Sequence, residues 1–130
     1  MKYVILFLSM VFLHIFDDYV LQNALARLKQ KSTWEEYVKE TPIYKNDYKM
    51  ALFEHALEWT LVVHSPFMIY AYIHNIDGIG KIAALITSVI FNTAVHYITD
   101  DAKANAKKIN LIQDQLIHFM QVIVIFLLFF

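Results

Sequence analysis

The sequence contains no cysteine, and only two glycines and two prolines among its 130 residues. The absence of cysteine excludes disulfides, thiolate metal sites and cysteine nucleophiles, so any metal must be held by nitrogen and oxygen ligands. So few glycines and prolines leave few sharp turns. The charges nearly balance, with a formal net charge of -1. The chain therefore lacks the basic surface that nucleic-acid binding requires, and we expect no nucleic-acid partner.

Hydrophobic residues make up 58% of the chain, the mean hydropathy is +0.44, and the apolar residues fall in four blocks. Each block reaches the roughly 20 helical residues that cross a bilayer core of about 30 Å. We therefore expect an all-α fold, a four-helix transmembrane bundle that forms a single membrane domain over residues 1–130. The expected helices span about residues 3–28, 49–74, 79–104 and 110–130.

Two alternatives compete with the membrane bundle. A soluble helical bundle would carry its apolar residues along one stripe of each helix, whereas the tail VIVIFLLFF is apolar on all sides. The first block could also be a cleavable signal sequence that ends near residues 24–26, since it has a basic start and an apolar centre. Asp17, Asp18 and Gln22 would then form an oddly long and acidic stretch before the cleavage point. The four-helix membrane bundle is the better interpretation.

The only long connection runs from Arg27 to Lys49 and is the most highly charged part of the chain. The stretch STWEEYVKE has the composition of a helix start, and Pro42 would end that helix. Aromatic side chains alternate here with Lys and Glu, which predicts a short amphipathic helix at the membrane interface within about residues 33–47. Most Lys and Arg residues lie on this connection and on residues 100–110. The positive-inside rule then predicts a multi-pass protein of the inner (cytoplasmic) membrane with both termini outside.

Polar residues interrupt all four blocks at positions that share a helix face. In three blocks a histidine and an aspartate are four residues apart, and residues at this spacing lie one above the other on a helix. Counting turns from the block ends puts the polar residues in one layer near the cytoplasmic face. The layer consists of His14, Asp18 and Gln22 in the first block, His55 in the second, His96, Asp100 and Lys103 in the third, and Asp114, Gln115 and His118 in the fourth.

Ionisable side chains in the hydrocarbon are costly, so this layer must face the bundle interior and find partners there. Its members could neutralise one another, or they could bind a divalent cation such as Zn, Mn, Fe or Ni. Helix bundles are known to hold two metals between such side chains, although the Glu-x-x-His motif of the soluble di-iron bundles is absent here. The candidate metal ligands are His14, Asp18, His55, His96, Asp100, Asp114 and His118.

The same residues supply candidates for catalysis and binding. Asp18, Asp100 and Asp114 are candidate acid or base groups, and Lys103 is a candidate for holding an anionic group. Gln22 and Gln115 would orient ligands or substrate. His64 is about 13 Å from His55 along a helix that rises 1.5 Å per residue, so we expect it to lie outside the layer.

The motifs His14-x3-Asp18-x3-Gln22, His96-x3-Asp100-x2-Lys103 and Asp114-Gln115-x2-His118, with His55 between them, resemble a family of small bacterial and phage membrane proteins. This is the domain of unknown function 3307 family. The resemblance spans about residues 13–120, apart from the segment between 30 and 48. It implies a multi-pass membrane protein with a His/Asp/Gln cluster and brings no established reaction.

These observations predict a membrane-embedded, metal-dependent hydrolase that acts at the cytoplasmic interface. A bound metal lowers the pKa of a coordinated water and polarises a phosphoryl or carbonyl oxygen. The expected partners are membrane lipids and a lipid-like or phosphorylated small-molecule substrate. One alternative is a non-enzymatic protein that binds or transports divalent cations or protons. Another is a phage membrane protein that binds a host component, with the cluster serving structure alone.

Overall fold

The computed structural model describes all residues 1–130 as an all-helical chain, which confirms the expected all-α class. Three expected helices form within a few residues of their predicted bounds. The helix expected at 3–28 is instead broken by a π-helical turn. In chain order the elements are α1 (Lys2–Phe16), the π-helical turn (Asp17–Leu21), α2 (Asn23–Leu28), a 3₁₀ turn (Lys31–Trp34), α3 (Glu35–Glu40), a second 3₁₀ turn (Pro42–Asn46), α4 (Asp47–Ile73), α5 (Ile79–Ala104) and α6 (Leu111–Phe129).

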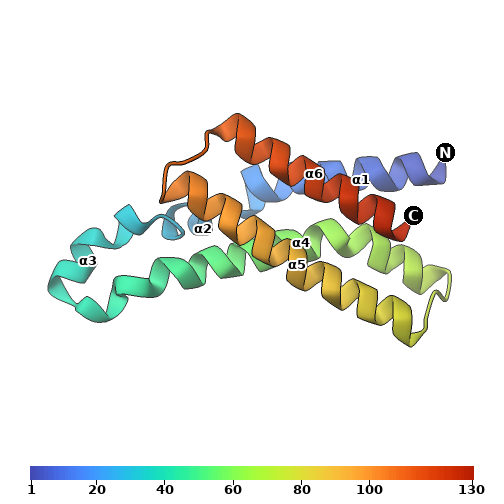
Figure 1. Ribbon diagram of the computed structural model, residues 1–130, viewed down its shortest axis with the longest axis horizontal. Coiled ribbons are helices and arrows are strands. Elements are labelled where there is room, and N and C mark those ends of the chain that lie inside the picture. The colour runs from blue at the N-terminus through green and yellow to red at the C-terminus, as the bar shows by residue number, and fades with distance from the viewer.

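The four long helices run side by side, and α4 occupies a central position (Figure 1). Both α1 and α5 pack against α4 and against α6. The two chain termini and the α4–α5 turn lie at one end of the molecule. The α5–α6 connection lies towards the opposite end, and α3 projects beyond it. This arrangement brings the first turns of α6, the last turns of α5 and the π-helical turn to the same level.

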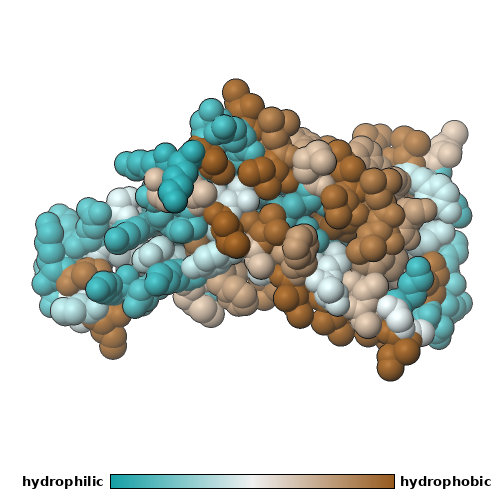
Figure 2. Space-filling model, in the orientation of Figure 1, coloured by the Kyte–Doolittle hydropathy of each residue, from teal (hydrophilic) through white to brown (hydrophobic).

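Three segments are long and apolar enough to cross a membrane: Lys2–Leu21, Ile79–Ala104 and Leu111–Phe129, with mean hydropathies of 1.9, 1.5 and 1.8. Large apolar side chains such as Phe12, Ile90 and Leu127 are exposed on the outside of these helices. Figure 2 shows hydrophobic surface over α5 and α6 and hydrophilic surface around α3. An exposed apolar surface of this extent, on helices long enough to cross a bilayer, is typical of a membrane protein.

Helix α4 does not belong to the set of three apolar spans, although the sequence predicts a crossing there. With 27 residues it is long enough, at about 40 Å. Its polar residues His55, Thr60 and His64 are fully buried, because α4 packs against α1, α2, α5 and α6. A helix surrounded by protein can carry polar side chains that a lipid-facing helix cannot. The low hydropathy of α4 thus reflects its central position.

A proline inside α4 is accommodated by its neighbour. Pro66 has no N–H to donate to the carbonyl of Val62, four residues earlier. The Ser65 hydroxyl donates to the Val62 carbonyl instead, at 2.7 Å. The helix therefore continues through this position.

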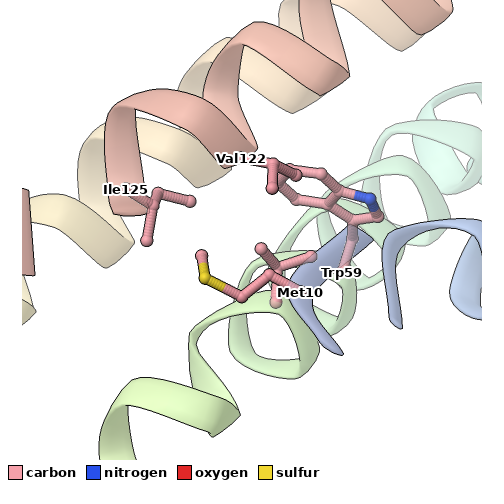
Figure 3. Close-up of a cluster of buried hydrophobic side chains, with 5 residues drawn as sticks. Met10, Trp59, Val122 and Ile125 are labelled. Atoms are coloured by element: carbon pink, nitrogen blue, oxygen red, sulfur yellow. The ribbon is translucent and has the colours of Figure 1, made fainter. Parts of the chain in front are cut away.

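The apolar core joins α1, α4 and α6 through five buried residues, Met10, Trp59, Val63, Val122 and Ile125. In Figure 3 the side chains of Met10, Trp59, Val122 and Ile125 lie close together between these helices. Phe7, Phe126 and Phe129 pack around the cluster. The indole N–H of Trp59 reaches His14, so the core borders the polar layer directly.

Two local features determine where α5 and α6 begin. Gly78 precedes α5 with a φ of +114°, a backbone conformation that side chains rarely permit. Helix α6 begins with a capping box. The Asn110 side chain accepts a hydrogen bond from the Gln113 N–H, and the Gln113 side chain accepts one from the Asn110 N–H, both at 3.0 Å. This box fixes where α6 starts and thereby the level of Asp114.

Replacing Asn110 by alanine is expected to lower the free energy of unfolding by about 1 kcal/mol, because the backbone N–H of Gln113 loses its side-chain acceptor. Equilibrium unfolding in mixed detergent micelles measures this change. Lys108→Ala is the control, since Lys108 is exposed and its side chain makes no hydrogen bond or ion pair. Equal stability of the Asn110 variant and the wild type would contradict a capping role.

Candidate functional site

Asp100 is the centre of the buried polar layer, and side chains from four segments surround its carboxylate. Its Oδ1 lies 3.1 Å from His118 Nε2 of α6. Its Oδ2 lies 3.3 Å from His55 Nε2 of α4 and 3.7 Å from His96 Nε2, one turn earlier on α5. The Lys29 ammonium, which follows α2, pairs with the same Oδ2 at 2.5 Å. The expected grouping of His55, His96, Asp100 and His118 is thus present.

The imidazole rings of this group are arranged so that their Nε2 atoms converge. His55 Nε2 and His96 Nε2 are 3.0 Å apart, and the His96 ring stacks on the His118 ring at 4.0 Å between centroids. Ligand atoms of His96, Asp100 and His118 lie within 4.8 Å of one another, as do those of Asp18, His55 and His96. Two ligands bound at 2.0–2.1 Å to one tetrahedral ion are roughly 3.3 Å apart. The spacing is therefore compatible with a divalent cation at this point.

Asp114 extends the group on α6. Its Oδ2 pairs with Lys103 Nζ at 2.5 Å, and its Oδ1 is buried without a hydrogen bond, 3.5 Å from His118 Nε2. His118 Nε2 therefore faces one oxygen of Asp100 and one of Asp114. Two carboxylate oxygens and an imidazole lone pair repel each other, so a cation at Nε2, either a proton or a metal, is needed to stabilise them.

The other ring nitrogen of His118 is held by Gln121. Gln121 Nε2 lies 3.0 Å from the backbone carbonyl oxygen of Asn92 and 3.0 Å from the Asn92 Oδ1. A carbonyl only accepts, so the Gln121 amide donates to Asn92 and turns its Oε1 towards His118 Nδ1, at 3.1 Å. His118 Nδ1 must therefore carry a hydrogen. Metal-binding histidines commonly anchor their second nitrogen in this way.

The hydrogen-bonded chain continues from Asn92 towards the middle of the bundle. Asn92 Nδ2 donates to the Ser88 hydroxyl at 3.3 Å, and this hydroxyl lies 2.9 Å from His64 Nε2. His64 Nδ1 donates to the Thr60 carbonyl at 2.7 Å, so His64 Nε2 accepts from Ser88. All donors in the chain point from His118 to His64. His64 lies outside the group, as expected, yet it is linked to it.

Asp18 is held by the two glutamines that the sequence suggested as orienting residues. Gln22 Nε2 donates to its Oδ1 at 3.0 Å, and Gln115 Nε2 donates to its Oδ2 at 2.9 Å. Only 8% of the Asp18 side chain is exposed, and His14 Nδ1 is 3.8 Å away. The expected shared face of His14 and Asp18 is therefore seen, with Asp18 fixed by amides of the first and last helical segments.

His14 belongs to neither group of converging ligand atoms. The Trp59 indole N–H donates to His14 Nδ1 at 2.9 Å, and an indole N–H can only donate. The neutral His14 ring then carries its hydrogen on Nε2, which is buried without a partner. Both nitrogens are therefore unavailable as ligands in this arrangement, because each needs its lone pair free to bind a metal.

Lys29 is a member of the site that periodicity could not reveal. It lies in the connection after α2, where the sequence suggests a solvated cytoplasmic charge. The structure folds this connection beneath α5, so that Lys29 is only 9% exposed and pairs with Asp100, 71 residues away. Asn105, at the end of α5, holds this connection in place. Its side chain accepts a hydrogen bond from the Lys31 N–H and donates one to the Lys29 carbonyl.

Asp17 is also in the interior, which the sequence did not predict. It lies seven residues after Met10 and three after His14, so it continues the buried face of α1 into the π-helical turn Asp17–Leu21. Asp17 is fully buried, and both of its carboxylate oxygens lack a partner. Single π-helical turns within α-helices occur frequently at functional sites. The spacing of Met10, His14 and Asp17 is the signal in the sequence that could have found it.

A small polar cavity of about 70 Å³ opens next to Asp100. Its polar lining comes from Asp18, Gln22, Lys29, Asp100, Lys103 and Gln115. The ligand candidates Asp18 and Asp100 thus border a space that small molecules can enter, whereas His55, His96 and His118 lie deeper and are almost fully buried. All of the expected catalytic and orienting residues except Asp114 line this cavity.

The charges of the layer do not balance when its histidines are neutral. The three aspartates Asp18, Asp100 and Asp114 outnumber Lys29 and Lys103, which leaves an excess of one negative charge when the partnerless, fully buried Asp17 keeps its proton. A cation, either a bound metal or a proton on an imidazole, would offset this excess. The nitrogen and oxygen donors, together with the partnerless Asp114 Oδ1, fit a divalent cation.

Comparisons with known proteins identify no relative of this chain. No family model, no curated protein and no solved structure matches the chain. The function must therefore be inferred from the geometry of the cluster.

Proposed function

We propose that the chain is an integral membrane metalloprotein that hydrolyses a phosphate- or lipid-linked substrate near the cytoplasmic face. The observation that carries this proposal is the Asp100 carboxylate, which has three histidine Nε2 atoms within 3.7 Å. These histidines come from α4, α5 and α6. Such convergence in a membrane interior is costly unless a cation or a set of protons balances it.

In the proposed membrane arrangement α4 is the fourth crossing of a four-helix bundle with α1, α5 and α6. Its length of about 40 Å and its central position support this. Helix α3 and its aromatic neighbours Trp34, Tyr37 and Tyr44, which pack on one another, would lie at the interface. The excess of Lys and Arg at the α3 end makes that end cytoplasmic and puts both termini outside, in an inner membrane.

His55, His96, Asp100 and His118 are the residues that would hold the cation, with Asp114 and Asp18 beside them. A divalent cation there would supply an activated water and polarise a phosphoryl or carbonyl oxygen. Asp18 borders the cavity and is held at both oxygens by Gln22 and Gln115. A carboxylate accepts further hydrogen bonds, so Asp18 is placed to take up the proton of an attacking water.

Cation or proton transport is the main rival function, and the hydrogen-bonded chain to His64 is the observation that favours it. Two links of that chain are the amides of Asn92 and Gln121, which hold protons and do not exchange them readily. Beyond His64 lie the stacked rings of Phe67 and Phe129, at 4.0 Å between centroids. The polar interior thus ends beneath aromatic side chains, which argues against a path to the other face.

The test is the metal content of the protein purified in mild detergent, measured by elemental analysis, together with calorimetric titration of Zn, Mn, Fe and Ni. We expect about one ion per chain or more. His96→Ala should weaken binding by more than about 100-fold, because loss of a partner that merely orients a ligand already costs 10–100-fold. His74→Ala is the matched control, since His74 is exposed in the α4–α5 turn.

A wild-type protein that binds none of these metals would contradict the proposal. If the metal binds, two assays separate enzyme from transporter. Release of phosphate from phosphorylated lipids and soluble phosphate esters would support a hydrolase. Uptake of the metal into liposomes that contain the protein, without hydrolysis, would instead support transport.

A further inference from the structure

The cavity of about 70 Å³ is lined by four side chains that donate hydrogen bonds and by the carboxylates of Asp18 and Asp100. Lys29 and Lys103 border it with their ammonium groups, and Gln22 and Gln115 border it with amides that donate to Asp18. Only one of these four side chains, Lys29, lies outside the polar layer expected from the sequence. Two ammonium groups and two amides at one opening are the donor set that binds phosphoryl oxygens.

Each lysine is at present neutralised by a carboxylate that is also a candidate metal ligand. Lys29 Nζ pairs with Asp100 Oδ2, the oxygen that faces His55 and His96. Lys103 Nζ pairs with Asp114 Oδ2, while Oδ1 of the same carboxylate faces His118. A cation bound among the histidines therefore competes with both lysines for the same two carboxylates.

We propose that this cavity is a phosphoryl-binding site that becomes available when a divalent cation binds, which rests on the proposed metal function. The cation withdraws Asp100 and Asp114 from the lysines and cancels the negative excess of the layer. Lys29, whose side chain is only 11% exposed, then lacks a counter-ion, and a buried unpaired ammonium is strongly unfavourable. An anion in the cavity restores the pairing. Binding is thus ordered, with the cation first and the phosphoryl group second.

The size of the cavity limits the ligand to a single phosphoryl group. A volume of about 70 Å³ holds roughly two waters at about 30 Å³ each. The remainder of a larger substrate must then lie outside it, past the apolar lining residues Tyr19 and Leu111, which are exposed at the surface. This geometry suits a phosphate monoester whose organic part rests at the membrane interface.

The experiment measures binding of radiolabelled inorganic phosphate to the full-length protein in phosphatidylcholine nanodiscs, with and without Mn²⁺. We expect Mn²⁺ to strengthen phosphate binding by about 10-fold or more. Lys29→Met and Lys103→Met should each weaken it by about 10-fold, since each removes a charge-assisted hydrogen bond. Neither variant should weaken Mn²⁺ binding, because each removes a competitor for a metal ligand. Lys108→Met, which removes an exposed lysine, is the control.

Phosphate binding that is equally strong without Mn²⁺, or that survives both lysine substitutions, would overturn the proposal. Because Lys103 is about one third exposed, its variant remains informative even if the Lys29 variant fails to fold. If Mn²⁺ does not bind but Zn, Fe or Ni does, that cation replaces Mn²⁺ in the assay, and failure of all four to bind would refute the proposed metal function and this inference with it. Mn²⁺ binding without phosphate binding would refute the inference alone. Nanodiscs with phosphatidic acid then show whether a lipid headgroup displaces the free phosphate, in which case the lipid is the source.

Discussion

Replacing Asp100 by asparagine is expected to abolish divalent-cation binding and to lower the free energy of unfolding by about 3–5 kcal/mol. Asparagine keeps the shape of the side chain and can still accept a hydrogen bond from His118. It removes the negative charge, so the Lys29 ammonium is left buried without a counter-ion. Breaking a buried ion pair by removing one partner is destabilising because the other charge stays desolvated.

A double variant separates the structural effect from the metal effect. Lys29→Met in the Asp100→Asn background removes the unpaired charge, so we expect much of the lost stability to return. Metal binding should not return, because the carboxylate ligand is still missing. Unfolding by denaturant in mixed micelles gives the stabilities, and calorimetric titration gives the metal affinity. The ion-pair interpretation would be wrong if the double variant were less stable than Asp100→Asn.

The parts of the site that the sequence predicted are those that helix periodicity controls. His96 and Asp100, and Asp114 and His118, meet because residues four apart share a helix face. Counting turns from the ends of the expected crossings put the three histidine–aspartate pairs at one level. His55 could be assigned to the same layer in the same way. These inferences need no knowledge of how the helices turn towards one another, since an ionisable residue in a membrane helix must face the interior.

The parts that were missed depend on tertiary contacts, or on a spacing that was not followed far enough. Lys29 meets Asp100 only because the chain folds back after α2. Asp17 is buried on the helix face of Met10 and His14, seven and three residues earlier, so helix periodicity could have identified it. The Trp59 indole donates to His14 Nδ1, and no spacing in the sequence brings these two residues together. A donor that only another helix supplies leaves no periodic signal.

The fold shows the same division between local and tertiary information. Hydropathy identified Lys2–Leu21, Ile79–Ala104 and Leu111–Phe129 as spans, because their outer faces meet lipid. It is a poorer guide for α4, which ten buried residues connect to the rest of the protein. For a central helix, the composition reflects neighbouring side chains such as Ser88 and His14 more than it reflects the membrane. The proposed fourth crossing therefore rests on length and position.

Replacing Gln121 by leucine is expected to weaken metal binding by about 10–100-fold, although Gln121 is no ligand candidate. Its Oε1 accepts from His118 Nδ1, and its amide is fixed by two bonds to Asn92. Leucine fits the same space but offers no acceptor. His118 then loses the contact that holds the hydrogen on Nδ1, so the ring can rotate or move that hydrogen to Nε2, where it blocks the ligand position.

Two measurements distinguish this positioning role from simple destabilisation. Nitrogen-15 spectra of histidine-labelled protein report which ring nitrogen carries the hydrogen, with His118→Ala used to assign the signal. In the metal-loaded protein we expect the Nδ1–H form of His118 in the wild type and a mixture in Gln121→Leu. Gln121→Glu keeps an acceptor for His118, but its second oxygen cannot donate to Asn92, so it should recover only part of the metal affinity. Ser88→Ala, two links further along the chain, should have a much smaller effect. Equal losses in Gln121→Leu and Ser88→Ala, with the His118 signal unchanged, would show that the chain contributes packing and does not orient His118.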